Sequence, residues 1–573
     1  MEELGFLCPF NNSLKQAYIF EVESGKNCSS SLNFFNREEL HMKKRWALIS
    51  VFEKSGIVEF AKQLIALGFS ILASGGTAKT LIAADVPVKD VSELVGGEAI
   101  LGHRVVTLSR EVHAGLLARY IDVDLAEMEK LGLPYIDLVC NDLYPLQTEI
   151  DKSNSTPASV IEMTDIGGPT MIRSAAKGRR IVICDPADRA SVIDWLKKGE
   201  PDKEAYLNSL AAKGEFIIAK YCLISAMYHG QGEYDGAIGR LVGSGKAENG
   251  QQGKFNHYTI DSSDPLALEN FKLIAGMEPS YNNMCDLDRL LQTATHVAAT
   301  LDLSVGQVPK FAIGVKHGNA CGAAWGQYRQ DVIQKMVTGD SLALFGGLVM
   351  VNFTIDAKIA ELLLTYGSEQ RRLLDGIIAP EFSEDAIEML RRKGDKCRFI
   401  VNPSLEHLKE SSLDRSLRRR TVRGGYLRQA NYTFALDINH PGLVKYGLAS
   451  IDQECDMLFA KAVGDTTNSN TITLVKNHQV IGNAVGQQAR VRGCNLAVNL
   501  AGYSDHETED AVAASDSFFP FYDGIEVLHH AGVKAILTTS GSVNDKLSIE
   551  YCQKNGIVLY MIPDSIGRGF FGH

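Results

Sequence analysis

The stretch FSILASGGTAKTLIAA (69–84) decides the fold class of this chain. Its first six residues form the apolar run that is typical of a buried strand, and AKTLIAA has the composition of a helix. Between them Gly75, Gly76 and Thr77 form a glycine turn whose bare backbone N–H groups begin the helix. A strand, a glycine turn and a helix in this order indicate an α/β domain with a parallel sheet.

The same unit recurs on both sides of this stretch. WALISV (46–51) is a further buried strand, and GIVEFAKQLIALG (56–68) has apolar residues at helical spacing and ends on glycine. Later strands are predicted at DLVCN (137–141) and RIVICD (180–185). We therefore expect one α/β domain over residues 42–238, with anion sites where the strands give way to helices.

The composition divides the remainder of the chain into an N-terminal extension, a linker and a second region. GRLVGSGKAENGQQGKFNH (239–257) is glycine-rich and polar, which predicts a linker, and 258–573 is a second α/β region long enough for two sub-domains. Residues 1–41 have no periodicity, and Met42 is followed at once by KKRWALISV. We expect a poorly ordered extension there, or an upstream start choice; the alternative is an ordered arm that packs on a partner chain.

Composition excludes several classes of function. The chain has 573 residues and a net charge of −11, which argues against nucleic acid and anionic membranes as partners. No apolar run approaches the length of a membrane span. MEELGFLCPFNN has no basic region followed by an apolar region, so we do not expect it to be a signal peptide. Eleven cysteines occur without CxxC pairs, which favours reduced thiols over disulfides or zinc ligands. We expect a cytoplasmic protein.

Groups suited to a phosphate monoester gather at the ends of the first two predicted strands. They offer hydroxyls, backbone N–H groups and one ammonium, which bind phosphate together. These residues are Ser50, Lys54, Ser74, Gly75, Gly76 and Thr77. The alternative is a plain turn in which the threonine only caps a helix.

A second candidate site lies in GVKHGNACGAAWG (314–326), where Lys316 and His317 are adjacent after an apolar strand. An imidazole can act as a base near neutral pH, and a neighbouring ammonium can stabilise a developing oxyanion. Taken alone, such a dipeptide is more often a solvated surface pair.

The order of motifs along the chain resembles the bifunctional purine biosynthesis family that joins AICAR transformylase to IMP cyclohydrolase. The similar segments cover most of 45–573 in the family's order. They are SVFEKSG (50–56), ASGGTAKTL (73–81), LGHRVVTLSREVHAGLLAR (101–119), DLYP (142–145), TDIGGPTMIRSAAKG (164–178), KHGNACG (316–322), GDSLALFGG (339–347), GIIAPEFSEDAIEML (376–390), SNTITL (469–474), GQQARV (486–491) and DSFFPFYDGI (516–525).

The resemblance implies a methylglyoxal-synthase-like first domain that closes formyl-AICAR to IMP. In that reaction the carboxamide nitrogen attacks the formyl carbon and water leaves, which needs phosphate anchoring, an oxyanion stabiliser and a proton shuttle. By resemblance, Arg104 and Thr107 contact the ligand, while Tyr144, Asp165 and Lys177 handle charge and protons.

For residues 258–573 the resemblance implies two cytidine-deaminase-like sub-domains that move a formyl group from 10-formyltetrahydrofolate to AICAR. His317 is then the proton acceptor and Lys316 the neighbouring charge, and Asn470 orients the formyl group or the imidazole. The zinc signature of the deaminases is absent from the sequence, so we expect no catalytic metal.

The resemblance also supplies binding residues and an assembly. Phe518 and Asp523 match positions that contact the folate pterin, and a carboxylate suits the amino and N–H donors of that ring. Arg568 matches an arginine that contacts the nucleotide, in this family often from the partner subunit. A homodimer is therefore expected.

In the first domain the chain departs from the family pattern at three places. Val106 stands where the family has a lysine for the oxyanion, Ser109-Arg110 replaces His-Pro, and Asp142 replaces an asparagine. Loss of an oxyanion donor typically costs about 10²–10³ in rate. Ring closure is therefore expected to be impaired, unless Arg110 or Lys177 compensates.

In the second region Ala320 replaces a proline, and the family's RYGxNPHQ stretch is missing. KFNHYTIDSS (254–263) occurs instead, where His257 or Tyr258 would be partial substitutes. Two alternatives to the bifunctional enzyme stay open: a transformylase with a non-catalytic first domain, and a pseudoenzyme that binds purine intermediates.

Overall fold

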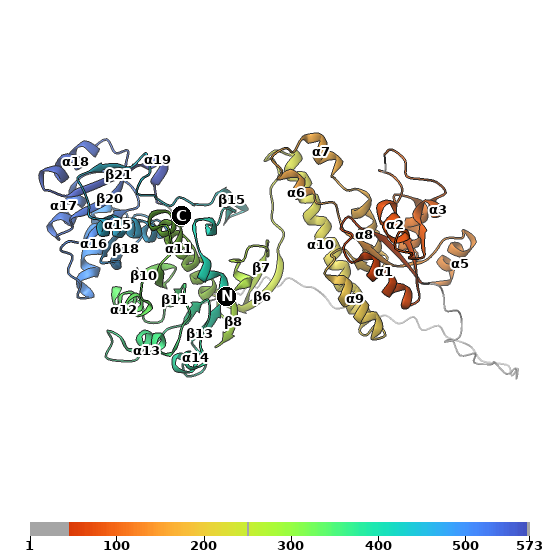
Figure 1. Cartoon of the computed structure of the whole chain (residues 1–573), viewed down its shortest axis with the longest axis horizontal. Helices are drawn as coiled ribbons and strands as arrows, with labels where there is room; N and C mark the ends of the chain where they lie inside the picture. Colours follow the sequence, from red (N-terminus) through yellow and green to blue (C-terminus); the bar gives the residue numbers. More distant parts are fainter. Residues whose placement is uncertain (1–44, 103, 249–250, 570–573) are drawn as a thin grey trace, which may run out of the picture. The chain divides into compact units, whose positions relative to one another are not determined.

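The computed structural model describes residues 45–102, 104–248 and 251–569. The extension predicted over 1–41 lies outside these ranges. The chain divides into two compact units, Met1–Gly236 and Ala237–His573 (Figure 1). No helix within the described ranges is long and apolar enough to cross a membrane.

The first unit contains a five-stranded sheet in the order β3-β2-β1-β4-β5, and all its pairs are parallel, as predicted. The strands are β1 (Arg45–Ser50), β2 (Phe69–Ala73), β3 (Val88–Asp90), β4 (Ile136–Asn141) and β5 (Ile181–Ile183). The helices are α1 (Ile57–Ala66), α2 (Gly75–Ile82), α3 (Val91–Val95), α4 (Arg110–Leu117), α5 (Asp122–Lys130), α6 (Leu146–Ile150), α7 (Pro157–Glu162), α8 (Gly167–Lys177), α9 (Asp188–Lys197) and α10 (Lys203–His229).

The core of the first unit explains why these segments are strands. Ala47, Leu48 and Ile49 of β1 are fully buried, because helices cover both faces of a parallel sheet and leave no polar side to the strand. The helices contribute Phe60, Leu64, Met171 and Ile172 to the same core. The carboxyl ends of β1, β2 and β4 consequently open at one edge, where ligands bind in such sheets.

The second unit contains a twelve-stranded sheet in the order β16-β21-β20-β19-β17-β18-β10-β9-β11-β12-β13-β8. Its strands are β8 (Lys272–Ala275), β9 (Lys310–Lys316), β10 (Asn319–Gly326), β11 (Leu348–Val351), β12 (Gly376–Ala379), β13 (Arg398–Val401), β16 (Val444–Tyr446), β17 (Ile472–Lys476), β18 (Gln479–Ala484), β19 (Val512–Ser515), β20 (Ala535–Ser540) and β21 (Val558–Pro563). Its helices are α11 (Tyr281–Val305), α12 (Arg329–Gly339), α13 (Ala357–Thr365), α14 (Glu384–Leu390), α15 (Ile451–Gly464), α16 (Arg490–Tyr503), α17 (Asp523–His530), α18 (Asp545–Lys554) and α19 (Asp564–Gly567). Three 3-10 turns, η1 (Leu268–Asn270), η2 (Pro403–His407) and η3 (Glu410–Ser412), complete it.

This sheet consists of two halves with the same topology, green and blue in Figure 1. In each half a long helix precedes an antiparallel hairpin, β9–β10 or β17–β18, which is followed by three strands parallel to one another. The halves join through β10 and β18, and one buried core contains Leu290 of α11 and Met457 of α15. Two sub-domains are therefore present, and their likeness to cytidine deaminases stays a prediction.

The segment predicted as a linker, 239–257, contains structure. β6 (Arg240–Lys246) and β7 (Lys254–Thr259) form an antiparallel hairpin that belongs to the second unit. Alternate residues of β7 are half-buried, as in a strand with one covered face. A Cβ at Gly245 would come within 2.5 Å of the carbonyl oxygen of Pro279, so this glycine permits close approach of two backbones. The sequence suggested a flexible linker there because glycine is common both in linkers and where two backbones approach closely.

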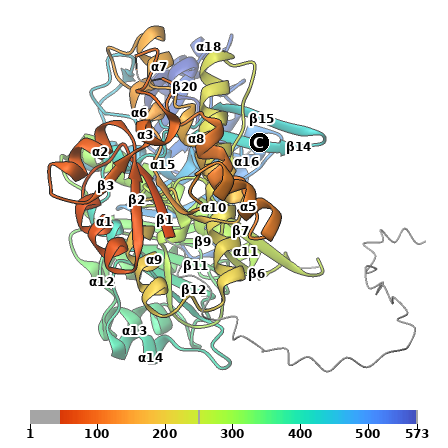
Figure 2. The same cartoon turned by 90° about the vertical axis from the view of Figure 1, so that its right-hand side faces the viewer.

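A second hairpin, β14 (Leu417–Val422) and β15 (Gly425–Ala430), extends from the unit with every residue of β15 exposed (Figure 2). Leu417, Leu427 and Tyr426 are among its exposed apolar side chains. An isolated two-stranded hairpin is marginally stable in water. The exposed apolar side chains of this arm are typical of a surface that packs against another element.

Candidate active sites

The predicted phosphate cradle forms at the carboxyl ends of β1 and β2. The hydroxyl groups of Ser50 and Ser74 lie 2.8 Å apart, and Ser74 begins α2. A Cβ at Gly76 would lie 3.7 Å from Nζ of Lys54, so the ammonium lies over the glycine turn. Gly75 and Gly76 are exposed, which leaves their backbone open to a ligand. The structure thus brings together hydroxyls, backbone N–H groups and a cation.

Thr77 contributes differently from the other cradle residues. Its hydroxyl group accepts a hydrogen bond from the backbone N–H of Val51 at 3.1 Å and donates to the Val51 carbonyl at 3.2 Å. Thr77 is only 2% exposed. It therefore ties the first turn of α2 to the end of β1, and its role in the cradle is to fix the backbone.

Two of the three predicted proton-handling residues, Asp165 just before α8 and Tyr144 after β4, interact with each other, and Tyr144 contacts Phe52 of the loop that carries Lys54. Asp165 accepts a hydrogen bond from the N–H of Gly168 at 2.9 Å, and its own N–H donates to the Tyr221 hydroxyl at 2.7 Å. Burial raises the pKa of the Asp165 carboxyl, the Gly168 hydrogen bond opposes this, and the charge of Asp142 adds to it. Burial and the Asp165 charge also raise the pKa of Tyr144, whose ring contacts Phe52 edge to face at 5.6 Å.

Asp142 stabilises the loop that carries Lys54. Its carboxylate accepts hydrogen bonds from the N–H groups of Phe52 and Glu53. Arg189 forms an ion pair with Asp142 at 3.6 Å and donates to the carbonyl of Ser55 at 2.8 Å. Sequence reasoning missed Arg189, because nothing in its helix pattern marks it as a partner of a distant loop.

The two residues predicted to contact the ligand, Thr107 and Arg104, and the valine at the predicted oxyanion position, Val106, differ in their surroundings. Thr107 is buried, and a Cβ at Gly167 would come within 2.8 Å of its hydroxyl group, so it lies at the start of α8. Arg104 is exposed and forms an ion pair with Glu162. Val106 is half-buried and packs against the hydrophobic core of the unit, together with Leu143.

Lys177 does not lie with Asp165. It is exposed in the last turn of α8, whereas Asp165 precedes the first turn. Ten residues of helix span about 15 Å, so the side chains begin at opposite ends of α8. Arg110 is likewise turned outward, with its side chain 80% exposed and paired with Glu111. Whether either cation compensates for Val106 stays a prediction.

In the second unit Lys316 and His317 occupy the tight turn between β9 and β10. Lys316 pairs with Asn319, and the two residues between them, His317 and Gly318, both have positive φ (53° and 72°). Positive φ at both positions is the signature of a type I′ hairpin turn, which matches the twist of the strands. His317 is exposed at this turn, whereas residues 311–315 of β9 are buried.

A cavity of about 220 Å³ lies against this turn. Its polar lining consists of Lys316, His317, Asn319, Asp340 and Asn483. Lys316 donates from Nζ to the carbonyl of Phe345 at 2.8 Å. Sequence reasoning missed Asp340 and Asn483, which come from different parts of the chain.

The Lys316–His317 turn also contacts α11. Asp286 accepts a hydrogen bond from the N–H of Gly318 and interacts electrostatically with His317. Burial raises the pKa of the Asp286 carboxyl, and the Gly318 hydrogen bond and the His317 charge oppose this. A carboxylate beside the imidazole suits a histidine that accepts a proton.

Asn470 lies in a separate cluster of buried polar groups. Its Oδ1 accepts from Nη2 of Arg490 at 2.7 Å, and its Nδ2 donates to the Gln487 carbonyl at 2.8 Å. Arg490 in turn forms a buried ion pair with Asp516. The oxygen and the nitrogen of the Asn470 amide are thereby fixed in direction. Arg490 and Asp516 were not among the site residues predicted from the sequence.

The predicted folate and nucleotide contacts are located near the end of the chain. Phe518 is half-buried, and Asp523 is exposed as the first residue of α17. Arg568 is exposed and pairs with Asp564 at 3.3 Å. A Cβ at Gly541 would contact both Phe518 and Asp564, so these two side chains are neighbours. None of these residues lines the cavity beside His317.

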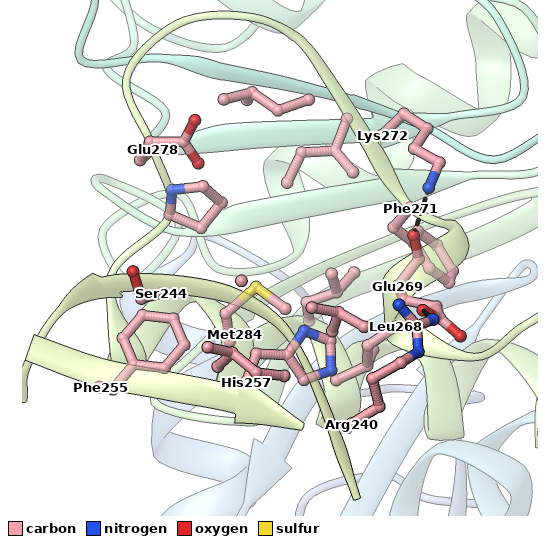
Figure 3. Close-up of a pocket in the computed structure, with 17 residues that line it drawn as sticks. Arg240, Ser244, Phe255, His257, Leu268, Glu269, Phe271, Lys272, Glu278 and Met284 are labelled. Atoms are coloured by element: carbon pink, nitrogen blue, oxygen red, sulfur yellow. Dashed lines mark hydrogen bonds and ion pairs between the residues drawn. The ribbon is translucent and has the colours of Figure 1, made fainter. Parts of the chain in front are cut away.

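His257 lies away from the Lys316–His317 turn, and its role as a substitute for the RYGxNPHQ stretch stays a prediction. It lines a different cavity of about 480 Å³ beneath the β6–β7 hairpin, with Arg240, Glu269 and Met284 (Figure 3). Met284 and Leu287 of α11 line that cavity, whereas Asp286 and Arg289 face the turn. Residues at these spacings lie on opposite faces of a helix. Tyr258 is exposed.

No group of three or more metal-ligating side chains occurs among the residues that the structure describes.

The fold and the two sites define a two-part enzyme with an anion-binding α/β unit and a histidine-bearing second unit. A family model described as "AICARFT/IMPCHase bienzyme" matches residues 175–500, and a model described as "MGS-like domain" matches 56–170. The chain belongs to the AICARFT/IMPCHase bienzyme family. Its function is de novo purine biosynthesis, with AICAR formyltransferase and IMP cyclohydrolase activities.

Curated relatives match this chain over nearly their whole length. "Bifunctional purine biosynthesis protein PurH" of Staphylococcus carnosus (strain TM300) is 34% identical over 530 residues, which is 91% of this chain and 98% of the relative. The protein of the same name from Anoxybacillus flavithermus (strain DSM 21510 / WK1) is 34% identical, with 90% and 98% covered. The solved "Crystal structure of ForH" is 34% identical and covers 33% of this chain and 100% of its own, with a TM-score of 0.30 that supports no conclusion about fold.

Proposed function

We propose that formyl transfer takes place at the Lys316–His317 turn, with 10-formyltetrahydrofolate as the donor. The observation that carries this proposal is the turn itself, which presents both side chains at a polar cavity. The amine of AICAR attacks the formyl carbon, and His317 accepts the amine proton as the C–N bond forms. Lys316 stabilises the oxyanion, which collapses as the bond to N10 of the folate breaks and that nitrogen takes up a proton.

Asn470 has a supporting role in this proposal. Because Arg490 and Gln487 fix its amide, it presents one constant orientation to the formyl group or the imidazole. Phe518 and Asp523 are proposed to contact the pterin. Assays of the full-length protein with AICAR and formylfolate, and separately with formyl-AICAR, test the two activities one at a time. A protein that binds AICAR and transfers no formyl group would instead be a pseudoenzyme.

We propose that the first unit closes the ring with its substrate phosphate in the cradle of Ser50, Lys54, Ser74, Gly75 and Gly76. Asp165 is the proposed proton carrier, because burial and the neighbouring Asp142 carboxylate raise its pKa above the ordinary value of a carboxyl group. Lys54→Gln should raise the KM for formyl-AICAR about tenfold, since a phosphate contact contributes to ground-state binding. Lys62→Gln, an exposed change on α1, is the matched control. An unchanged KM would remove the cradle from the mechanism.

A homodimer is proposed as the working assembly. Two features support it: the exposed β14–β15 arm, and the exposed position of Arg568 near the chain end. Light scattering across a dilution series tests the assembly, and a fully active monomer would overturn it. A cytoplasmic location is proposed as well, since the cysteines in the described ranges are free thiols.

A further inference from the structure

One side chain connects the two candidate catalytic segments of the second unit. Arg289 of α11 donates from Nε to the carbonyl of Gly318 at 3.2 Å. Its Nη2 donates to the Thr466 carbonyl at 2.9 Å and to Oδ1 of Asn468 at 3.1 Å. Gly318 follows His317 in the first half of the sheet, and Asn468 precedes Asn470 by two residues in the second half. A single guanidinium therefore spans the gap between the halves.

The surroundings of Arg289 make this connection rigid. A Cβ at Gly318 would lie 3.1 Å from Cγ of Arg289, so the stem of the side chain packs directly on the turn. One turn further along α11, the hydroxyl groups of Thr293 and Thr466 lie 2.8 Å apart, and both residues are buried. Asp286 holds the N–H of Gly318 from the same face of the helix. This face of α11 thus contacts both segments along its length.

The chemistry of the contact requires an arginine. The planar guanidinium donates in fixed directions from Nε and Nη2, so two acceptors on different segments acquire a defined separation. A lysine ammonium in the same place is a point charge on a flexible stem and fixes no such separation. Burial and the nearby charge of Arg418 lower the pKa of Arg289 to about 10, while Asp288 opposes this. The group remains a cation near neutral pH.

We propose that Arg289 is a positioning residue for formyl transfer, which sets the distance between the His317 turn and the Asn470 segment. Arg289 touches no reacting atom and acts through the two backbone segments that it joins. The inference rests on the proposed function, in which His317 and Asn470 serve the same reaction.

The central test is Arg289→Lys in the full-length protein, compared with Arg372→Lys. Arg372 is the control because it is another arginine of this unit that donates to backbone carbonyls, those of Leu363 and Tyr366; Arg372 is buried and Arg289 is half-buried. Arg289→Lys should lower kcat for formyl transfer about tenfold or more, because a misplacement of about 1 Å can cost 10²-fold. The KM for AICAR should change by less than about threefold. The rate of ring closure should be the same in Arg289→Lys as in the unchanged protein, which shows that the first unit is folded in the variant.

Two further measurements separate positioning from general destabilisation. Methylguanidine added to Arg289→Ala should restore part of kcat, because a free guanidinium can occupy the space and bridge the same acceptors. Asn468→Ala combined with Arg289→Lys should cost less than the sum of the single changes, since both remove one contact. An equal loss of activity in Arg289→Lys and Arg372→Lys, or an absence of rescue, would overturn the inference.

His317→Ala measured in parallel distinguishes two failures. If His317→Ala transfers formyl groups normally, the proposed site itself is wrong. If His317→Ala is inactive while Arg289→Lys behaves like Arg372→Lys, the site stands and Arg289 has no positioning role.

Discussion

The buried ammonium of Lys461 donates a 2.6 Å hydrogen bond to the backbone carbonyl of Gly567. Lys461 also pairs with Asp465, and the N–H of Gly569 donates to the backbone carbonyl of Asp516. The end of the described chain is therefore part of the polar interior of the second unit. Arg568 lies between these anchors with its own side chain exposed.

This arrangement predicts different outcomes for two changes at the chain end. Deletion of residues 566–573 should destabilise the second unit by about 1–3 kcal/mol, because Lys461 loses a buried acceptor. Arg568→Ala should leave the melting temperature unchanged and raise the KM for AICAR if the arginine binds nucleotide. Thermal melting and steady-state assays of both variants check this. Equal melting temperatures for the deletion and the full chain would show that the Gly567 contact is dispensable.

His317→Ala should lower formyl transfer by about 10²–10⁴-fold while AICAR binding stays near normal, because the imidazole acts on a proton in the transition state. Calorimetric titration with AICAR and turnover with formylfolate measure the two effects. His530→Ala, an exposed histidine at the end of α17, is the control for loss of an imidazole elsewhere in the unit. Unchanged turnover would exclude His317 as the base.

The pH dependence of ring closure should reveal the coupling of Asp142 with Asp165. If ionised Asp165 is the base, the rate falls as the pH drops through its raised pKa. Asp142→Asn removes a neighbouring negative charge, which lowers the pKa of Asp165 and moves the acid limb to lower pH. Asp151→Asn, at an exposed position, should leave the profile unchanged. An acid limb that stays in place would show that Asp165 is not the group that titrates.

Val106→Lys should raise the turnover of ring closure about tenfold or more, because it restores an ammonium for the developing oxyanion. Val106 packs on the core, and the stem of a lysine can cover the same apolar surface while its head reaches water. The gain should appear in kcat rather than in KM. Val105→Lys adds the same charge one residue away, where the backbone pairs with Ile100, and should bring no gain. A rate that Val106→Lys cannot improve would assign the oxyanion role to another residue.

The sequence predicted the first sheet well because its strands are continuous apolar runs bounded by glycine turns. WALISV (46–51) and DLVCN (137–141) each fall within one residue of the observed β1 and β4. The β6–β7 hairpin was missed because glycine hides the alternation of a half-buried strand. The role of Lys177 stays a prediction, and the structure places it at the opposite end of α8 from Asp165.

The sequence predicted individual site residues better than their partners. Lys316, His317 and the cradle residues belong to motifs, and the structure brings the members of each motif together. Arg289, Arg490 and Asp516 act through contacts between distant segments, which no local pattern reveals. Such partners depend on how the two halves of the sheet pack, and packing is set by the whole chain.

The two halves of the second unit contain equivalent hairpin turns. Lys476 pairs with Gln479 across Asn477 and His478, which both have positive φ, just as Lys316 pairs with Asn319. His478, however, is held by Asp456 at 2.7 Å and lies against the Trp325 ring at 4.1 Å. His478 takes the second position of its turn, where the first turn has Gly318. The same turn geometry therefore leaves His317 exposed in the first half, whereas in the second half it packs His478 against β10 and so joins the two halves.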